Sequence, residues 1–321
     1  MENNTGISKS IYAYKYAIGA AALFGASTPL AKLFLDEFQP VSLAACFYLG
    51  CGLGISILFF VRNTLFYEKT REIPRLERND LPWLTGAIIV GGIFAPVLML
   101  SGLSITTAAT ASLLLNFEAA ATTIIAYFIF RENLSKKSIS ALALITLAGI
   151  LLSSTGSGDY AFSFGAFAVI IACILWGFEN NMTCRISGKD PVAITAIKGV
   201  SAGICLLTAA FLLKETFPSP SVIAGSMLLG FLCYGLSIYF FIKSLNTTGA
   251  ARTSSMFAAS PFVGAMVSFL LFPGYPGISY FAAFAIMAAG AFLLFSENGK
   301  FKIFAASASM SEKMKDEDEI S

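Results

Sequence analysis

Apolar residues along this chain gather in runs of about 20, and short polar stretches separate the runs. A helix needs about 20 predominantly apolar residues to cross the hydrocarbon core of a bilayer. Turn-forming sequences such as "STGSGD", "SGKDP" and "FPGYPG" lie between the runs. The pattern predicts an all-α integral membrane protein with ten transmembrane helices. The predicted spans are residues 12–35, 40–61, 81–103, 107–130, 138–155, 161–184, 192–213, 222–243, 248–272 and 277–296.

Composition agrees with a membrane location. Of the 321 residues, 56% are hydrophobic and 12% are charged, whereas soluble domains carry about 25% charged residues. The first apolar run, residues 11–35, is longer than the apolar core of about 7–15 residues in a cleavable signal, so we expect it to be a span. We therefore predict a multi-pass protein of the cell membrane, which has the lipid bilayer as a partner. The net charge of +2 gives no indication of a nucleic-acid partner.

Basic residues predict the orientation of the spans. If the N-terminus is cytoplasmic, all but four of the 21 Lys and Arg residues fall at cytoplasmic positions. The exceptions are Lys32 and Lys214 at the opposite ends of spans, and Lys198 and Arg252 within spans. Cytoplasmic loops carry an excess of Lys and Arg, so both termini are predicted to be cytoplasmic. The charged tail "SEKMKDEDEIS" is expected to be disordered and solvated.

The chain also shows an internal repeat. The stretch "LSITTAATASLLLNFEAAATTIIAYFIF" begins at Leu103, and "LNTTGAARTSSMFAASPFVGAMVSFLLF" begins 142 residues later at Leu245, with identities that include Ala-Ala and Ser. A second pair, "LFGAS…FQP" and "LWGFE…KDP", recurs at an offset of 151–152 residues. A duplicated unit of five spans must insert the other way up, as in secondary transporters built from inverted repeats. We therefore predict two inverted five-helix repeats, residues 1–155 and 156–298, and a cytoplasmic tail, residues 299–321.

These repeats resemble the two EamA units of the drug/metabolite transporter superfamily. The first unit is "ASLLLNFEAAATTIIAYFIFRENLSKKSISALALITLAGILL" and the second is "RTSSMFAASPFVGAMVSFLLFPGYPGISYFAAFAIMAAGAFLL". Ala119 stands where family members often have Pro, which the second half keeps as Pro261, and Glu132 has no counterpart in "FPGYPG". The resemblance covers roughly residues 12 to 296. It implies a secondary carrier, most often an exporter of amino acids or related metabolites.

Ionisable side chains inside spans are costly, so they usually face a cavity, a partner or the interface. Glu118 lies about eleven residues from either end of its span, too far for its short side chain to reach the headgroups. We interpret it as part of a substrate or proton pathway, with a protonated structural acid as the alternative. Asn116 points elsewhere on the same helix and suits a helix–helix contact, although it is retained as a candidate for substrate binding.

The sixth predicted span carries a polar face. Trp176, Glu179, Asn180 and Thr183 fall at positions i, i+3, i+4 and i+7. Glu179 is interpreted either as a site acid or as an interfacial acid paired with Arg185 or Lys198. Lys198 and Arg252 either reach the cytoplasmic headgroups or serve the site by attracting an anionic group or neutralising Glu179.

Three prolines are candidate hinges for alternating access. Pro96 and Pro261 lie mid-span and are expected to kink the third and ninth helices. Pro29, in "GASTP" of the first span, removes a backbone donor and is expected to free carbonyls toward a cavity. Tyr48, Tyr234 and Tyr239 are weaker candidates for cavity lining.

The absence of histidine excludes Ser-His-Asp catalysis and His-ligated metals. The six cysteines lie in apolar runs without metal-ligand spacing, and no Asp lies mid-span, so we predict no catalytic residue, metal or cofactor. No nucleotide-binding GxxxxGK[ST] motif occurs. The predicted protein is not an enzyme but a monomeric or homodimeric secondary carrier that exports a small amphipathic metabolite, with Glu118 as the proton-linked acid. The alternative is a passive channel or facilitator for small neutral solutes.

Overall fold

The computed structural model describes residues 2–65, 74–130, 135–154, 164–248, 253, 256–274, 277–294 and 296. Every regular element in this part of the chain is a helix, which confirms the predicted all-α class. The elements in the first half are α1 (Glu2–Phe34), α2 (Pro40–Leu65), η1 (Arg78–Asp80), α4 (Leu81–Ala87), η2 (Ile88–Phe94), α5 (Ala95–Ser104), α6 (Ala108–Leu114), α7 (Asn116–Phe130) and α8 (Lys136–Ser154). Those in the second half are α9 (Phe164–Ile186), α10 (Pro191–Leu212), α11 (Pro220–Leu229), η3 (Gly230–Leu236), α12 (Ser237–Thr248), α14 (Ser260–Leu271) and a last helix, Ile278–Leu294.

Seven helical segments in the described residues are long and apolar enough to cross a membrane. They are Lys15–Phe34, Pro40–Leu65, Arg78–Ser104, Ala108–Ile129, Phe164–Ile186, Pro191–Leu212 and Pro220–Thr248. The three other predicted spans coincide with α8, α14 and the last helix, of which the latter two are shorter apolar helices. The count of ten spans and the cytoplasmic location of both termini stay predictions. The predicted repeat boundary at residues 155 and 156 and the tail, residues 299–321, lie outside the described residues.

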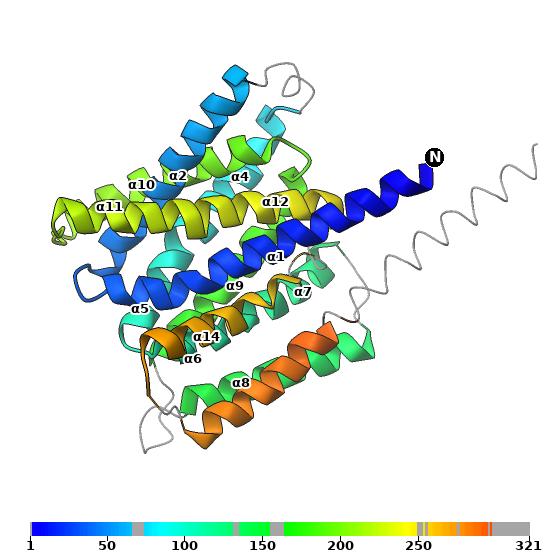
Figure 1. Cartoon of the computed structure of the whole chain (residues 1–321), viewed down its shortest axis with the longest axis vertical. Helices are drawn as coiled ribbons and strands as arrows, with labels where there is room; N and C mark the ends of the chain where they lie inside the picture. The colour runs from blue at the N-terminus through cyan, green and yellow to red at the C-terminus, as the bar shows by residue number, and fades with distance from the viewer. Residues whose placement is uncertain are drawn as a thin grey trace, which may run out of the picture.

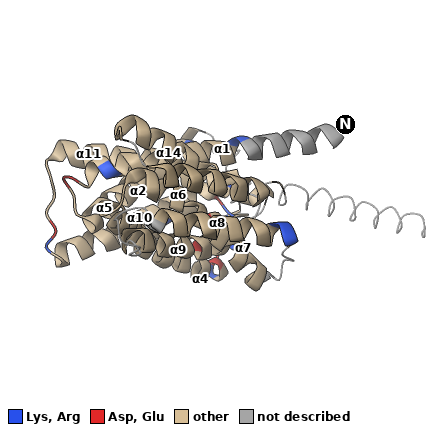
Figure 2. Ribbon diagram, turned by 90° about the horizontal axis from the view of Figure 1, so that it is seen from below, with Lys and Arg blue, Asp and Glu red and all other residues tan. Residues whose placement is uncertain are grey.

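The outer surface of the helices is apolar. Phe128, Leu270 and Ile278 are 74%, 80% and 82% exposed. Charged residues gather mainly towards the helix ends, and most of the ribbon between them carries none (Figure 2). Apolar side chains that face outward from a helical bundle are suited to contact with lipid chains.

The third and eighth predicted spans are each interrupted by a π-helical segment. These segments are η2, with sequence IIVGGIF, and η3, with sequence GFLCYGL. They begin 142 residues apart, which equals the offset between the repeated stretches that begin at Leu103 and Leu245. Pro96 lies in the first turn of α5, which continues directly from η2, so its missing N–H leaves a carbonyl group of η2 without its helix partner. The irregularity expected at Pro96 is therefore present, but it precedes the proline as a π segment.

The fourth and ninth predicted spans are broken near their middles. The fourth breaks at Leu115, between α6 and α7, although it contains no proline. The ninth has a turn at residues 258–259, and Pro261 follows in the first turn of α14. The ninth predicted span is therefore interrupted next to Pro261, and the role of this proline as a hinge stays a prediction. Pro29, in contrast, lies inside α1, which continues without interruption to Phe34.

Glycines allow several helices to approach one another closely. A Cβ on Gly52 of α2 would lie 2.3 Å from the backbone nitrogen of Val200, and one on Gly199 of α10 would lie 2.5 Å from the nitrogen of Gly52. Close backbone approach at small residues is typical of helix packing in membranes. Gly290 of the last helix packs in the same way against Ile145 of α8, and these two helices lie side by side at one edge of the bundle (Figure 1).

Polar contacts join the ends of α2 and α10. The Arg62 guanidinium at the end of α2 donates to both carboxylate oxygens of Asp190, at 2.9 and 2.5 Å. Asp190 Oδ1 also accepts from the Val192 nitrogen and so caps the N-terminus of α10. At the opposite end of the pair, Glu215 Oε2 accepts from the Ser42 nitrogen in the first turn of α2, at 2.6 Å. The two helices are therefore held together at both ends.

Two substitutions at Asp190 separate its two roles. Asp190→Asn keeps an N-cap side chain but loses the ion pair with Arg62, and we expect it to lower the free energy of unfolding by about 1–3 kcal/mol. Asp190→Ala also loses the cap, which is expected to cost about 1 kcal/mol more. Equilibrium unfolding of the purified protein in mixed micelles measures both values. Equal stability of the wild type and Asp190→Asn would show that the pair contributes nothing.

Candidate functional site

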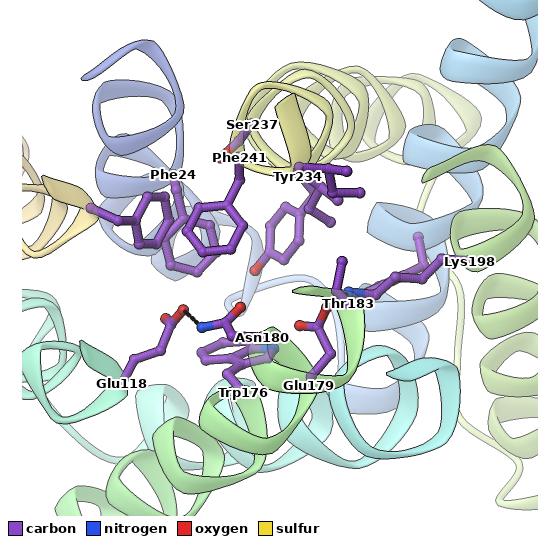
Figure 3. Close-up of a pocket in the computed structure, with 14 residues that line it drawn as sticks. Phe24, Glu118, Trp176, Glu179, Asn180, Thr183, Lys198, Tyr234, Ser237 and Phe241 are labelled. Carbon is purple, nitrogen blue, oxygen red and sulfur yellow. Dashed lines mark hydrogen bonds and ion pairs between the residues drawn. The ribbon is translucent and has the colours of Figure 1, made fainter. Parts of the chain in front are cut away.

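A small cavity lies among α1, α2, α7, α9, α10 and the eighth predicted span (Figure 3). Its volume is about 40 Å³, close to the share of one water molecule in the liquid, about 30 Å³. Small-molecule sites usually measure about 300–1,000 Å³, so the cavity is smaller than a usual ligand site. The lining residues are Phe24, Tyr48, Glu118, Trp176, Glu179, Asn180, Thr183, Lys198, Tyr234, Ser237, Ile238, Phe241, Ile242 and Phe257.

Glu118 reaches the cavity from the first turn of α7, just after the break at Leu115. Its Oε1 accepts a hydrogen bond of 2.9 Å from Asn180 Nδ2, and the same amide nitrogen lies 3.1 Å from Thr122 Oγ1. Glu118 is 7% exposed and is joined to no Lys or Arg by an ion pair in the described part of the chain. A buried carboxyl group without a cationic partner is able to exchange a proton or to bind a cation.

The second acid in the cavity, Glu179, is paired. Lys198 Nζ lies 2.6 Å from Glu179 Oε1, and Thr183 Oγ1 donates to the same oxygen at 2.9 Å. Of the sequence alternatives, the structure places Lys198 and not Arg185 beside Glu179. Arg185 lies over the ring of Trp83, 5.6 Å from its centroid. Lys198 is 2% exposed, so it does not extend to the helix ends but neutralises Glu179 within the bundle.

The π segment η2 holds two of the lining side chains through a single carbonyl group. Gly91 O accepts hydrogen bonds from Tyr48 Oη at 2.9 Å and from Trp176 Nε1 at 3.1 Å. A Cβ on Gly91 would lie 2.3 Å from Glu179 Cγ, so glycine is required for this approach of η2 to α9. Two cavity-lining aromatic side chains are thereby fixed to the backbone of η2.

Aromatic rings enclose the rest of the cavity. The ring of Phe24 lies 5.7 Å from Trp176, 5.9 Å from Tyr234 and 5.1 Å from Phe257, measured between centroids. Phe241 adds an edge contact with Phe257 at 4.9 Å. These separations suit edge-to-face and tilted aromatic packing. The result is an aromatic enclosure around the carboxamide and carboxylate groups (Figure 3).

The structure brings most of the candidate residues together and leaves some out. Glu118, Trp176, Glu179, Asn180 and Lys198 all line the cavity. Asn116 does not belong to the lining. It is fully buried where α7 begins, and its Nδ2 donates to Leu113 O at 3.2 Å. The amide nitrogen is therefore turned back onto the turn before the helix break, whereas Oδ1 is buried without a hydrogen-bond partner among the described residues.

The remaining candidates are peripheral to the cavity or not described. Arg252 lies outside the described residues. Pro29, Pro96 and Pro261 are not among the residues that line the cavity, and their role as hinges stays a prediction. Tyr239 faces Lys243, whose ammonium lies 4.9 Å from the ring centroid, and not the cavity.

Sequence reasoning missed several lining residues. No polar atom distinguishes the lining residues Phe24, Phe241 and Phe257 from other apolar positions in the sequence. Tyr48 and Tyr234 also line the cavity, although the sequence makes them only weaker candidates. One signal was available for Phe24, because it is the repeat counterpart of Trp176 in "LFGAS" and "LWGFE". Both residues line the same cavity and their rings are in contact.

Comparison with known proteins agrees with this architecture. The sequence model of the EamA-like transporter family matches residues 11–155 and 163–296. An uncharacterized transporter of Methanothermobacter thermautotrophicus is 28% identical over 308 residues, which cover 91% of this chain and 88% of the relative. The uncharacterized transporter YyaM of Bacillus subtilis is 21% identical over 271 residues, 81% of this chain and 86% of the relative.

A solved crystal structure has the same fold. It superposes with a TM-score of 0.64 over 89% of this chain and 95% of its own, at 16% sequence identity. At that identity the similarity concerns the fold alone.

Proposed function

Because this chain belongs to the EamA-like transporter family of the drug/metabolite transporter superfamily, we propose that it is a secondary active carrier that works by alternating access. The multi-pass membrane location and the transporter class follow from the family and from the apolar helices. The proposal goes further in naming the mechanism, the site and the substrate class. It places the protein in the cell membrane with both termini cytoplasmic, and it assigns export of an amino acid or a related amphipathic compound.

One observation carries the proposal: the polar cavity is built from both predicted repeats. Phe24, Tyr48 and Glu118 belong to the first predicted repeat, and Glu179 and Lys198 to the second. A site at the interface of inverted repeats is typical of secondary transporters, since it opens to either side as one repeat moves against the other. The cavity, at about 40 Å³, is smaller than a usual ligand site, and in this mechanism it enlarges as the repeats move against each other.

Glu118 is the proposed proton-linked group. It is buried, it lines the cavity, and among the described residues it has an amide but no cation as a partner. A carboxyl group in this setting gains or loses its proton according to which side of the membrane and which ligand it faces. The breaks beside it, at Leu115 and at residues 258–259, and the prolines Pro96 and Pro261 are the proposed points of bending.

Counterflow in proteoliposomes tests the carrier. We expect saturable uptake of labelled substrate into vesicles preloaded with unlabelled substrate. Glu118→Gln is expected to keep counterflow but to weaken its dependence on pH, because glutamine binds no proton. Glu37→Gln, a change at an exposed acid, is the matched control and is expected to leave the pH profile unchanged.

The same assay separates the outcomes. Flux that does not saturate, without counterflow, would identify a passive channel or facilitator for small neutral solutes. An unchanged pH profile in Glu118→Gln would remove the proton role from this residue while leaving the carrier intact.

A further inference from the structure

We propose that the cavity selects a protonated amine with a net charge of +1 over a zwitterion or an anion of the same shape. The inference rests on the proposed function, since it concerns the same site, but it names the charge of the group that is recognised. It narrows the proposed substrate class from amino acids and related amphipathic compounds to amines without a carboxylate, because a free amino acid carries a carboxylate as well as an ammonium group.

The first step is that the cation in the cavity already forms an ion pair with an acid of the protein. Lys198 is the one basic residue among the described residues that line the cavity. Its ammonium is 2.6 Å from Glu179, and both side chains are at most 10% exposed. A substrate carboxylate at Lys198 would share the ammonium group with Glu179 or displace it. Either arrangement places two carboxylates beside one cation and leaves one buried negative charge uncompensated.

The second step is that the other acid in the cavity, Glu118, forms no ion pair with a described residue. Glu118 Oε1 accepts from Asn180, and Oε2 takes part in no hydrogen bond or ion pair found among the described residues. The Glu179–Lys198 pair is neutral as a unit, so an ionised Glu118 sets the net charge of the described cavity lining at −1. A ligand with charge +1 neutralises the site, whereas a zwitterion introduces a second charge that finds no partner.

The third step is that the rings beside Glu118 suit a cation. Phe24, Trp176 and Phe257 surround the cavity with centroid separations of 5.1–5.7 Å. The faces of aromatic rings attract ammonium groups, most strongly when water is excluded. In Figure 3 the Glu118 carboxylate and the Asn180 amide lie below the rings of Phe24 and Phe241, and the Trp176 ring lies below Asn180. An ammonium group at Glu118 would therefore be contacted by a carboxylate and by aromatic faces at the same time.

The test uses Trp176 as an internal probe. The chain has two tryptophans, and Trp83 is 39% exposed and absent from the cavity lining. Trp83→Phe therefore leaves Trp176 as the reporter of the cavity. Three compounds with one branched chain are titrated into this variant: 3-methylbutylamine, leucine and 4-methylpentanoate, which carry charges of +1, zero and −1. We expect saturable fluorescence change, with half-saturation by the amine at a concentration at least about tenfold below that of leucine.

Glu118 variants complete the design. Glu118→Gln in the same background is expected to weaken amine binding about tenfold and to remove the preference over leucine, whereas Glu118→Asp keeps the charge and is expected to retain the preference. Glu37→Gln is again the control. Binding of leucine or 4-methylpentanoate as tight as that of the amine would overturn the inference, as would absence of amine binding or an unchanged preference in Glu118→Gln.

Counterflow of the same compounds keeps this inference separate from the carrier. Counterflow that prefers leucine would overturn the amine selectivity and support the carrier. Amine binding with the expected Glu118 dependence but without counterflow of any compound would support the selectivity and overturn the carrier.

Discussion

Lys198→Met is expected to lower the free energy of unfolding by about 3–5 kcal/mol, the usual effect of removing one partner of a buried ion pair. Methionine retains most of the length of the lysine stem but no charge, so Glu179 would be left buried with Thr183 as its remaining donor. Equilibrium unfolding in mixed micelles measures the change. Lys137→Met, at an exposed lysine in the first turn of α8, is the control and is expected to change stability by less than about 0.5 kcal/mol.

A double variant identifies the cause. Glu179→Gln with Lys198→Met removes both charges, and we expect most of the lost stability to return, because an apolar or neutral pair of similar volume replaces a buried ion pair at little cost. If the double variant were as unstable as Lys198→Met, the loss would come from packing of the lysine stem and not from an unpaired carboxylate.

Gly50→Ala is expected to be the second severe substitution. An added Cβ would lie 2.0 Å from the carbonyl oxygen of Met227 and 2.6 Å from its carbonyl carbon. These are backbone atoms of α11, so the clash is relieved only by moving a helix. Overpacking of this kind typically costs about 1–3 kcal/mol and occasionally more. Gly230→Ala, whose Cβ would lie 2.2 Å from Phe47 O on the facing helix, is expected to behave alike.

Gly188→Ala is the matched control for these glycines. Gly188 lies in the turn between α9 and α10, and an added Cβ there would meet nothing within 4 Å. We expect its unfolding free energy to equal that of the wild type within about 0.5 kcal/mol. Wild-type stability of Gly50→Ala would show that α2 and α11 are not as close as the structure has them.

Much of the architecture was predictable because apolar periodicity and turn residues report directly on helices. The helix of residues 164–186 was expected at 161–184, with Trp176, Glu179 and Asn180 on one face, and all three line the cavity. The choice between Arg185 and Lys198 as the partner of Glu179 was not predictable, because it depends on the distance between α9 and α10. Helical periodicity fixes the face of a helix but not the neighbour that the face meets.

Two kinds of feature had no sequence signal. The sequences IIVGGIF and GFLCYGL read as ordinary apolar runs, and nothing in them marks a π segment, which arises from how the backbone packs. The break at Leu115 also has no sequence signal. A proline at position 119 would have indicated it, but this chain has Ala119 there. Asn116 was chosen because it is polar within a span, yet its amide bonds the turn before it. Polarity alone does not separate a site residue from one that satisfies its own backbone.

The paired π segments have a consequence for the descent of the two halves. An α-helix turns by about 100° per residue, so one inserted residue rotates everything that follows to another face unless a π turn absorbs it. η2 and η3 stand 142 residues apart, at the offset of the repeated sequences. We infer that both segments go back to one inserted residue, copied together with the predicted repeat. Deleting one residue from η3 is expected to rotate α12 by about 100° and to move Ser237 and Phe241 away from the cavity that they line.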